Sequence, residues 1–171
     1  KYKYKTMDLD PARPLKVINQ QIYDWAAKAG FPPGFFRESY FDRVTFYCLP
    51  DHADCNFSHF SDCTFAVCRI SDARFDGTSL FRSEFHSCAI DHTTFFHATL
   101  ADTHFYDCDM AWLSLQQARL ARCNFIDCAM DSVNFMVSTL DGCGAGRCQV
   151  RNIRCLDQAA ITQGGATAEE A

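Results

Sequence analysis

The sequence of 171 residues predicts an all-β solenoid with four-sided coils, and three observations support this fold class. A large apolar residue occurs at every fifth position between residues 60 and 140. The residue two positions before each of them is mostly small. When the apolar positions are sorted at intervals of twenty, like residues fall together, as expected if four five-residue sides make one coil of a repeat fold.

A period of five fits neither an α-helix nor a strand, in which side chains alternate between two faces. The chain must therefore turn at each repeat, so that every fifth side chain points toward one axis. Coils stacked in this way lie about 4.8 Å apart, the spacing of paired strands. We expect the structural core to contain an all-Phe column and an all-Cys column: Phe65, Phe85, Phe105, Phe125, Cys68, Cys88, Cys108, Cys128 and Cys148.

The eleven cysteines are expected to be buried free thiols. Neighbours in the Cys column would be close enough for a disulfide, but their side chains would point in parallel, and small thiols are readily buried. Their spacing of twenty lacks the C-x₂-C pairs of zinc sites. Disulfides, a metal or a redox role for the thiols remain the alternatives. Free thiols indicate a reducing compartment, so we expect a cytoplasmic protein without a signal peptide or membrane span.

Residues 1–33 are predicted to be a lead-in followed by an α-helix that caps the solenoid. Asp10 and Pro11 form a helix start and Gly30 a helix stop, while Val17, Ile22 and other apolar residues share one helical face. A cap would cover the open end of the core and its unpaired strand edges. A docking helix for a partner is the alternative.

The β-helix itself is assigned to residues 34–156, and residues 157–171 to a C-terminal cap or disordered tail. Phe36, Phe41 and Phe46 also repeat at five, but out of phase with Phe60 onward. A four-residue insertion at positions 49–52 would explain the phase shift and give about six coils.

Several segments resemble the pentapeptide-repeat family, whose consensus is A-[DN]-[LF]-x-x: Ala53-Asp54-Cys55-Asn56-Phe57, Cys63-Thr64-Phe65, Ala73-Arg74-Phe75 and Cys123-Asn124-Phe125. The resemblance covers residues 34–155. It implies a right-handed quadrilateral β-helix in which the central Leu or Phe and the small residue two before it point inward. It implies no functional residues, because the motif is structural.

The outward positions carry mixed charge. The net charge is −5, and residues 55–155 contain eleven acidic residues and eight arginines, which argues against direct nucleic-acid binding. Asp62, Arg82, Asp102 and Arg122 alternate in sign at intervals of twenty. We expect them to form vertical ion pairs, each contributing about 0–1 kcal/mol.

Six outward apolar residues form the candidate protein-binding surface: Phe81, Phe96, Tyr106, Trp112, Ile126 and Met136. Tyr106 and Ile126 share a column with His86, and Phe96 shares one with Met136. Ordinary packing of outward side chains is the alternative interpretation.

We expect no enzyme, no cofactor and no metal, because the sequence contains no catalytic motif and the narrow interior is filled by its own side chains. The leading hypothesis is a non-catalytic protein-binding or scaffold module, with another protein as partner and a homodimer left open. The family resemblance implies an alternative, a gyrase-binding DNA mimic of the quinolone-resistance type, although the repeats are only mildly acidic and the C-terminal part is rich in Gly. A third hypothesis is a structural or targeting domain of a larger multidomain protein or effector.

Overall fold

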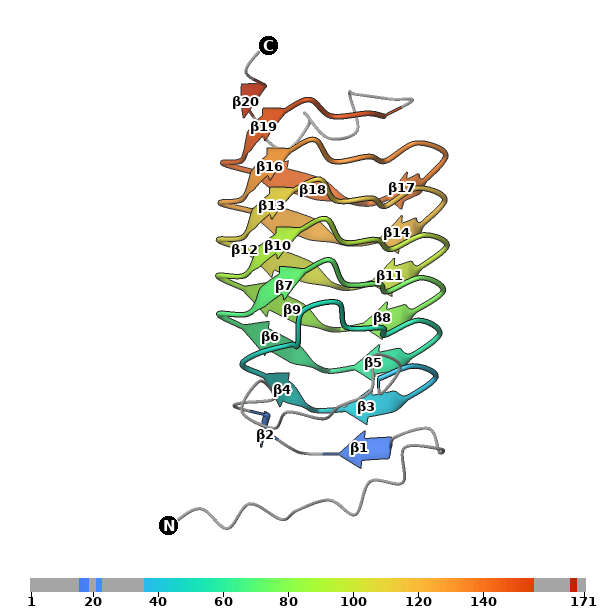
Figure 1. Ribbon diagram of the computed structural model, residues 1–171. Helices are drawn as coiled ribbons and strands as arrows, with labels where there is room; N and C mark the ends of the chain where they lie inside the picture. Colours follow the sequence, from blue (N-terminus) through green and yellow to red (C-terminus); the bar gives the residue numbers. More distant parts are fainter. Residues whose placement is uncertain (1–15, 19–20, 23–35, 156–166, 169–171) are drawn as a thin grey trace.

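The computed structural model describes residues 16–18, 21–22, 36–155 and 167–168. These residues form a β-solenoid of about six four-sided coils, with strands and no helix (Figure 1). This confirms the predicted fold class. No helix in this part of the chain is long and apolar enough to cross a membrane.

Two consecutive sides of each coil form parallel sheets that run the length of the solenoid. Face 1 is a seven-stranded sheet of β1 (Lys16–Ile18), β3 (Tyr40–Asp42), β5 (His59–Ser61), β8 (Ser79–Phe81), β11 (Thr99–Ala101), β14 (Arg119–Ala121) and β17 (Thr139–Asp141). Face 2, which follows it along the chain, is a seven-stranded sheet of β2 (Gln21–Ile22), β4 (Thr45–Phe46), β6 (Thr64–Ala66), β9 (Glu84–His86), β12 (His104–Tyr106), β15 (Asn124–Ile126) and β18 (Gly144–Gly146).

The other two sides complete each coil. Face 3 is a six-stranded parallel sheet of β7 (Arg69–Ser71), β10 (Ala89–Asp91), β13 (Asp109–Ala111), β16 (Ala129–Asp131), β19 (Gln149–Arg151) and β20 (Thr167–Ala168). Face 4 is a ladder of single parallel bridges that joins Asp54, Arg74, Thr94, Ser114, Asn134 and Arg154 in that order.

The register confirms that residues twenty apart lie on top of one another. Phe85 is paired with Phe105 and Leu100 with Leu120, and the offset of twenty holds on all four faces between residues 54 and 154. The chain turns because the residue two after almost every inward residue is left-handed: in the described part of the chain, twenty-one non-glycine residues have φ between +48° and +61°. One such residue lies at each corner and turns the chain, so that the middle side chain of the next five residues again points inward. This gives the period of five.

The predicted core columns are confirmed. Phe65, Phe85, Phe105 and Phe125 form a continuous stack, with successive ring centroids 4.4, 4.6 and 4.9 Å apart and planes within 8° of parallel. All eleven cysteines are free, and the five thiols of the Cys column are buried. Their Sγ atoms donate to backbone carbonyls of the coil below, as Cys88 does to Phe65 O at 3.3 Å. The thiols therefore add hydrogen bonds between coils.

The predicted N-terminal helix is wrong where the structure describes it. Lys16–Ile18 and Gln21–Ile22 are strands β1 and β2, which pair with β3 and β4. Val17 is in register with Phe41 and Ile22 with Phe46, so these residues five apart extend faces 1 and 2. The unpaired edges of the first coil favour added strands over a helix at these positions. The remainder of the predicted helix lies outside the described residues.

The predicted insertion at residues 49–52 is also wrong. Phe46 is in register with Phe65, nineteen residues later, whereas Phe65 is in register with Phe85, twenty residues later. This coil is therefore one residue short. Leu49 is buried and contributes to the core. The predicted C-terminal cap or tail lies outside the described residues except for β20, which pairs with β19.

Candidate functional site

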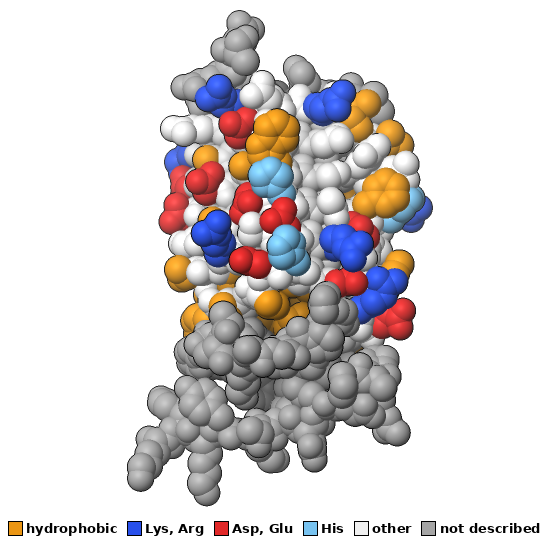
Figure 2. Space-filling model, viewed as in Figure 1, with side chains coloured by type: hydrophobic (Ala, Val, Ile, Leu, Met, Phe, Trp, Pro, Cys, Tyr) orange, Lys and Arg blue, Asp and Glu red, His pale blue; other side chains and the backbone are white. Residues whose placement is uncertain are grey.

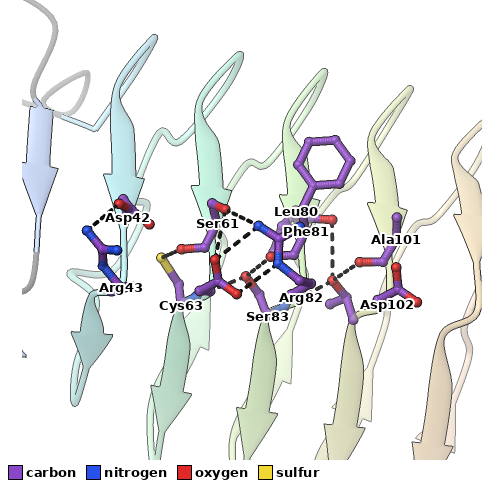
Figure 3. A network of polar contacts seen from close by, with 12 residues as sticks. Asp42, Arg43, Ser61, Cys63, Leu80, Phe81, Arg82, Ser83, Ala101 and Asp102 are labelled. Carbon is purple, nitrogen blue, oxygen red and sulfur yellow. Dashed lines mark hydrogen bonds and ion pairs between the residues drawn. The ribbon is translucent and has the colours of Figure 1, made fainter.

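The alternating charge column is a set of ion pairs on face 1, as predicted. Arg82 donates to both carboxylate oxygens of Asp62, at 2.9 and 3.0 Å, and Arg122 does the same to Asp102, at 2.7 and 3.0 Å. These bonds hold the pKa values of both carboxyl groups below their usual range. The Arg82 guanidinium also donates to Ser61 Oγ (Figure 3). Because each charge is neutralised by its neighbour, this face is a weak candidate for binding.

The six predicted surface residues lie on three faces and one corner and do not form one surface. Phe81 is on face 1, in β8. Tyr106 and Ile126 are in register on face 2. Phe96 and Met136 are outward residues of face 4, two positions after the bridge residues Thr94 and Asn134, and Trp112 is at the corner between faces 3 and 4. The structure thus brings together two groups: Tyr106 with Ile126, and Phe96, Trp112 and Met136.

Charge is sorted between the faces. Within residues 55–155, faces 2 and 3 with their corners carry seven carboxylates and three arginines, whereas faces 1 and 4 carry four carboxylates and five arginines. The arginines of faces 2 and 3 are confined to the end coils: Arg69, Arg147 and Arg151. The middle coils of these faces carry the carboxylates that, with Tyr106 and Ile126, we call the acidic surface: Glu84, Asp91, Asp107, Asp109, Asp127 and Asp131.

Local hydrogen bonds keep several of these carboxylates ionised. His92 lowers the pKa of Asp91, and Arg147 lowers that of Asp127. Asn152 donates to Asp131 at 3.2 Å and lowers its pKa in the same way. The acidic surface is therefore negatively charged at neutral pH.

An apolar stripe crosses the acidic surface on face 2. The Tyr106 ring stacks on the His86 ring, with centroids 4.8 Å apart and planes at 19°, and His86 Nε2 lies 2.6 Å from Glu84 Oε2. Ile126 continues the stripe on the next coil. Carboxylates lie around half-buried apolar side chains, which is the usual arrangement of a protein interface with a polar rim.

A second surface contains no Asp, Glu, Lys or Arg. We call it the neutral face; it consists of the outward positions of face 4 and its two corners over three coils: His92, Thr94, Phe96, His97, Trp112, Ser114, Gln116, Gln117, Ser132, Asn134, Met136 and Val137. Arg74 precedes it and Arg154 follows it in the bridge ladder. Figure 2 shows an uncharged area on this side of the molecule, with hydrophobic and His side chains at its margins.

Neither surface was recognised as a unit from the sequence. The signal was present, because sorting every outward residue at intervals of twenty separates the charged columns from the uncharged ones. Within the described ranges, no group of three or more His, Cys, Asp or Glu residues could hold a metal ion.

Comparisons with known proteins concern the fold. Solved structures to which this chain is similar include QnrB1, a plasmid-mediated fluoroquinolone resistance protein, at 16% identity and a TM-score of 0.38 over 91% of this chain and 90% of that chain. Rfr23 from the cyanobacterium Cyanothece 51142 is 11% identical, with a TM-score of 0.44 over 82% and 84% of the two chains. HetL from the cyanobacterium Nostoc sp. strain PCC 7120 is 11% identical, with a TM-score of 0.33 over 90% and 84%.

No curated protein sequence matches the chain. The profile of the pentapeptide repeat region matches residues 58–135 and 78–155. The two matches together span residues 58–155, more than half of the 171 residues. With the four-sided coils and their five-residue period, this match shows that the chain belongs to the pentapeptide repeat family.

Proposed function

We propose that the chain is a non-catalytic protein-binding module whose acidic surface holds a partner with a basic face. The observation that carries the proposal is the sorting of charge: although the overall charge is mild, six carboxylates gather on faces 2 and 3, and Asp127, at the end of this strip, pairs with Arg147 of the next coil. Complementary charge speeds the encounter of two proteins and selects the partner. The free thiols fit a reducing compartment, so a cytoplasmic location forms part of the proposal.

The contact itself is assigned to the apolar stripe. Tyr106 and Ile126 are half-buried at the centre of the acidic surface, and large apolar residues at the centre of an interface contribute most of the binding energy. The strands that hold them are paired on both sides, so the stripe is rigid before binding. A rigid surface loses little conformational entropy when a partner docks.

A matched pair of variants tests the proposal. The test variant combines Asp107→Asn, Asp109→Asn and Asp127→Asn, and the control makes the same change in charge on face 1 with Asp62→Asn, Asp102→Asn and Asp141→Asn. We expect a partner recovered by the native protein from lysate to be lost with the test variant and kept with the control. The binding should also weaken as salt rises.

Two further results decide the case. Tyr106→Ala should weaken binding of that partner by at least about tenfold, or 1.4 kcal/mol. Equal loss with the face 1 control, or full binding by Tyr106→Ala, would contradict the proposal. In either outcome the variants must retain the native circular dichroism spectrum, so that unfolding is not the cause.

A second candidate function is mimicry of duplex DNA toward a DNA-binding enzyme such as gyrase, as the family resemblance implies. The observation in its favour is charge density. Apart from Asp127, which pairs with Arg147, five carboxylates lie over three coils, a length of about 14 Å, or about one charge per 2.9 Å. Duplex DNA carries one charge per about 1.7 Å, so the strip has more than half the charge density of DNA over a length of about four base pairs.

A gyrase supercoiling assay separates this candidate from a general basic partner. We expect inhibition of supercoiling, or protection from a quinolone, that disappears with the acidic-surface variant. No effect at micromolar protein would exclude the candidate and leave the first proposal standing.

A further inference from the structure

We infer that the neutral face binds an uncharged oligosaccharide, with Trp112 as the side chain on which a sugar ring stacks. This site is separate from the acidic surface, and the inference does not rest on the proposed function. Three features of the neutral face point to this ligand: its lack of charge, its polar centre and the exposed indole.

The lack of charge defines the first property of the ligand. Residues 36–155 contain twenty-five charged side chains, yet none occupies the twelve positions of the neutral face. On each of the other three faces, the same coils carry charged outward residues, such as Asp102, Asp107 and Asp109. A charged ligand would meet no Asp, Glu, Lys or Arg among these twelve residues and would lose hydration, so the face fits a neutral ligand.

The distribution of polar groups argues against a protein partner. Protein interfaces place apolar side chains at the centre and polar ones at the rim. On the neutral face the centre is polar, with Ser114 and Gln116, while Trp112 lies at one edge and Phe96 on the coil below. Such an arrangement suits a ligand that makes hydrogen bonds along its length and stacks on aromatic rings.

The side-chain amide groups at the centre have hydrogen-bond donors and acceptors that the described part of the chain does not use. The side chains of Gln116 and Gln117 make no hydrogen bond with the described part of the chain. Asn134 uses its Oδ1 to accept from Met136 N at 2.9 Å, which leaves its NH₂ group to donate. Amides both donate and accept, as do the hydroxyl groups of a sugar, so each sugar hydroxyl can be satisfied in either sense.

Trp112 is exposed in a way that packing does not explain. Its side chain is 63% exposed, although its backbone is left-handed, with φ of +54°. Bulky side chains are disfavoured in this region, and the other residues of the same corner column are smaller and polar: His52, Asp72, His92, Ser132 and Asn152.

The indole is held in place by the coil below. The His92 ring is stacked with it, at a centroid distance of 6.2 Å and an angle of 17°. An oriented aromatic face attracts the positively polarised C–H groups of a sugar ring while burying apolar area. The three coils of the neutral face span about 14 Å, which accommodates a short oligosaccharide.

Titration with defined oligosaccharides tests the inference. The probes are maltohexaose, cellohexaose, xylohexaose and N-acetylchitohexaose, followed by calorimetry and by tryptophan fluorescence. We expect at least one of them to bind with a Kd on the order of 0.1–1 mM. Trp112→Ala should weaken that binding at least tenfold, whereas Trp112→Phe, which keeps an aromatic face, should retain most of it.

The controls locate the site and its preference. Phe81→Ala removes another exposed aromatic side chain, on face 1, and should leave binding unchanged. Trigalacturonic acid, an anionic probe, should bind at least tenfold more weakly than the best neutral probe. The inference is overturned if no neutral probe binds at about 10 mM, if binding survives in Trp112→Ala, if Phe81→Ala weakens it equally, or if the anionic probe binds as well.

Discussion

Phe85→Ala should be among the most destabilising substitutions in this protein. The Phe85 ring is fully buried and lies between Phe65 and Phe105, with centroids at 4.4 and 4.6 Å and planes within 8° of parallel. Truncation leaves a cavity and removes two stacked pairs at once. We expect a loss of about 4–5 kcal/mol in the free energy of unfolding, the upper part of the range for a buried Phe.

Phe125→Ala is the matched comparison within the same column. Phe125 stacks on Phe105 at 4.9 Å, but the position above it is Ala145, so one stacked pair is lost instead of two. A cavity lined by Phe125, Leu140 and Ala145 is already present at this end. We therefore expect a smaller cost, about 2–3 kcal/mol.

Urea unfolding followed by circular dichroism measures both costs, and hydrogen exchange shows where each variant opens. The second measurement is needed because neighbouring coils stabilise one another and a solenoid can unfold in parts. Phe85→Ala should loosen the middle coils, and Phe125→Ala only the last ones. If Phe125→Ala costs as much as Phe85→Ala, stacking within the Phe column is not the source of the stability.

Three further outcomes follow from local geometry. Gly77→Ala should lower the free energy of unfolding by about 1–2 kcal/mol, because φ is +63° and the new Cβ would lie 2.7 Å from the Phe57 ring. In a Phe57→Ala background, urea unfolding should show a smaller loss from the same substitution. The Cys143 thiol accepts a hydrogen bond from the buried Cys123 thiol, which lowers the pKa of Cys143 to about 7. Iodoacetamide should therefore label Cys143 first among the described thiols, at a rate that rises through pH 7. The Cys143→Ser variant should lack this labelling. Hydrogen bonds from Arg122 hold the pKa of Asp102 below its ordinary value of 3.8. The contribution of the ionised Asp102 to the free energy of unfolding is complete above pH 3.8 and is lost as the pH falls through the folded-state pKa. Acid unfolding of Asp102→Asn should therefore depend less on pH than that of the native protein.

The core was predictable because each inward position is constrained by two independent periods. A residue such as Phe105 is identified by its spacing of five along the chain and again by its match with Phe85 and Phe125 at twenty. Agreement between the two periods leaves little freedom in the assignment. The buried thiols follow from the same register, since their columns are inward by position.

The N-terminal segment was not predictable in this way, because it offers only two repeats. Val17 and Ile22 are five apart, which fits the solenoid, yet the surrounding apolar residues also fit one face of a helix. The structure favours the strands, which pair with β3 and β4. Backbone pairing at an open sheet edge is a tertiary effect, and a pattern of side chains contains no record of it.

The outward residues divide according to whether the backbone itself favours them. Asp107 and Asp127 are at left-handed corners, with φ of +52° and +53°, a conformation that Asp tolerates better than most residues. The fold alone therefore explains part of their acidity. Glu84 and Asp109 are strand residues of β9 and β13, where carboxylates are unfavourable by propensity.

The same division applies to the neutral face, and it explains why the sequence alone did not indicate this surface. Polar corner residues such as Ser132 are adequately explained by the backbone, whereas Trp112 at an equivalent corner, with φ of +54°, is not. The residues that the fold does not require are those most informative about function, and they can be recognised only when the corner and strand positions are known. Once these positions are assigned, Glu84, Asp109 and Trp112 stand out for one reason: each occupies a site where the backbone would favour another residue. They lie on separate surfaces, two on the acidic surface and one on the neutral face, so substitutions at one surface should leave binding at the other unchanged.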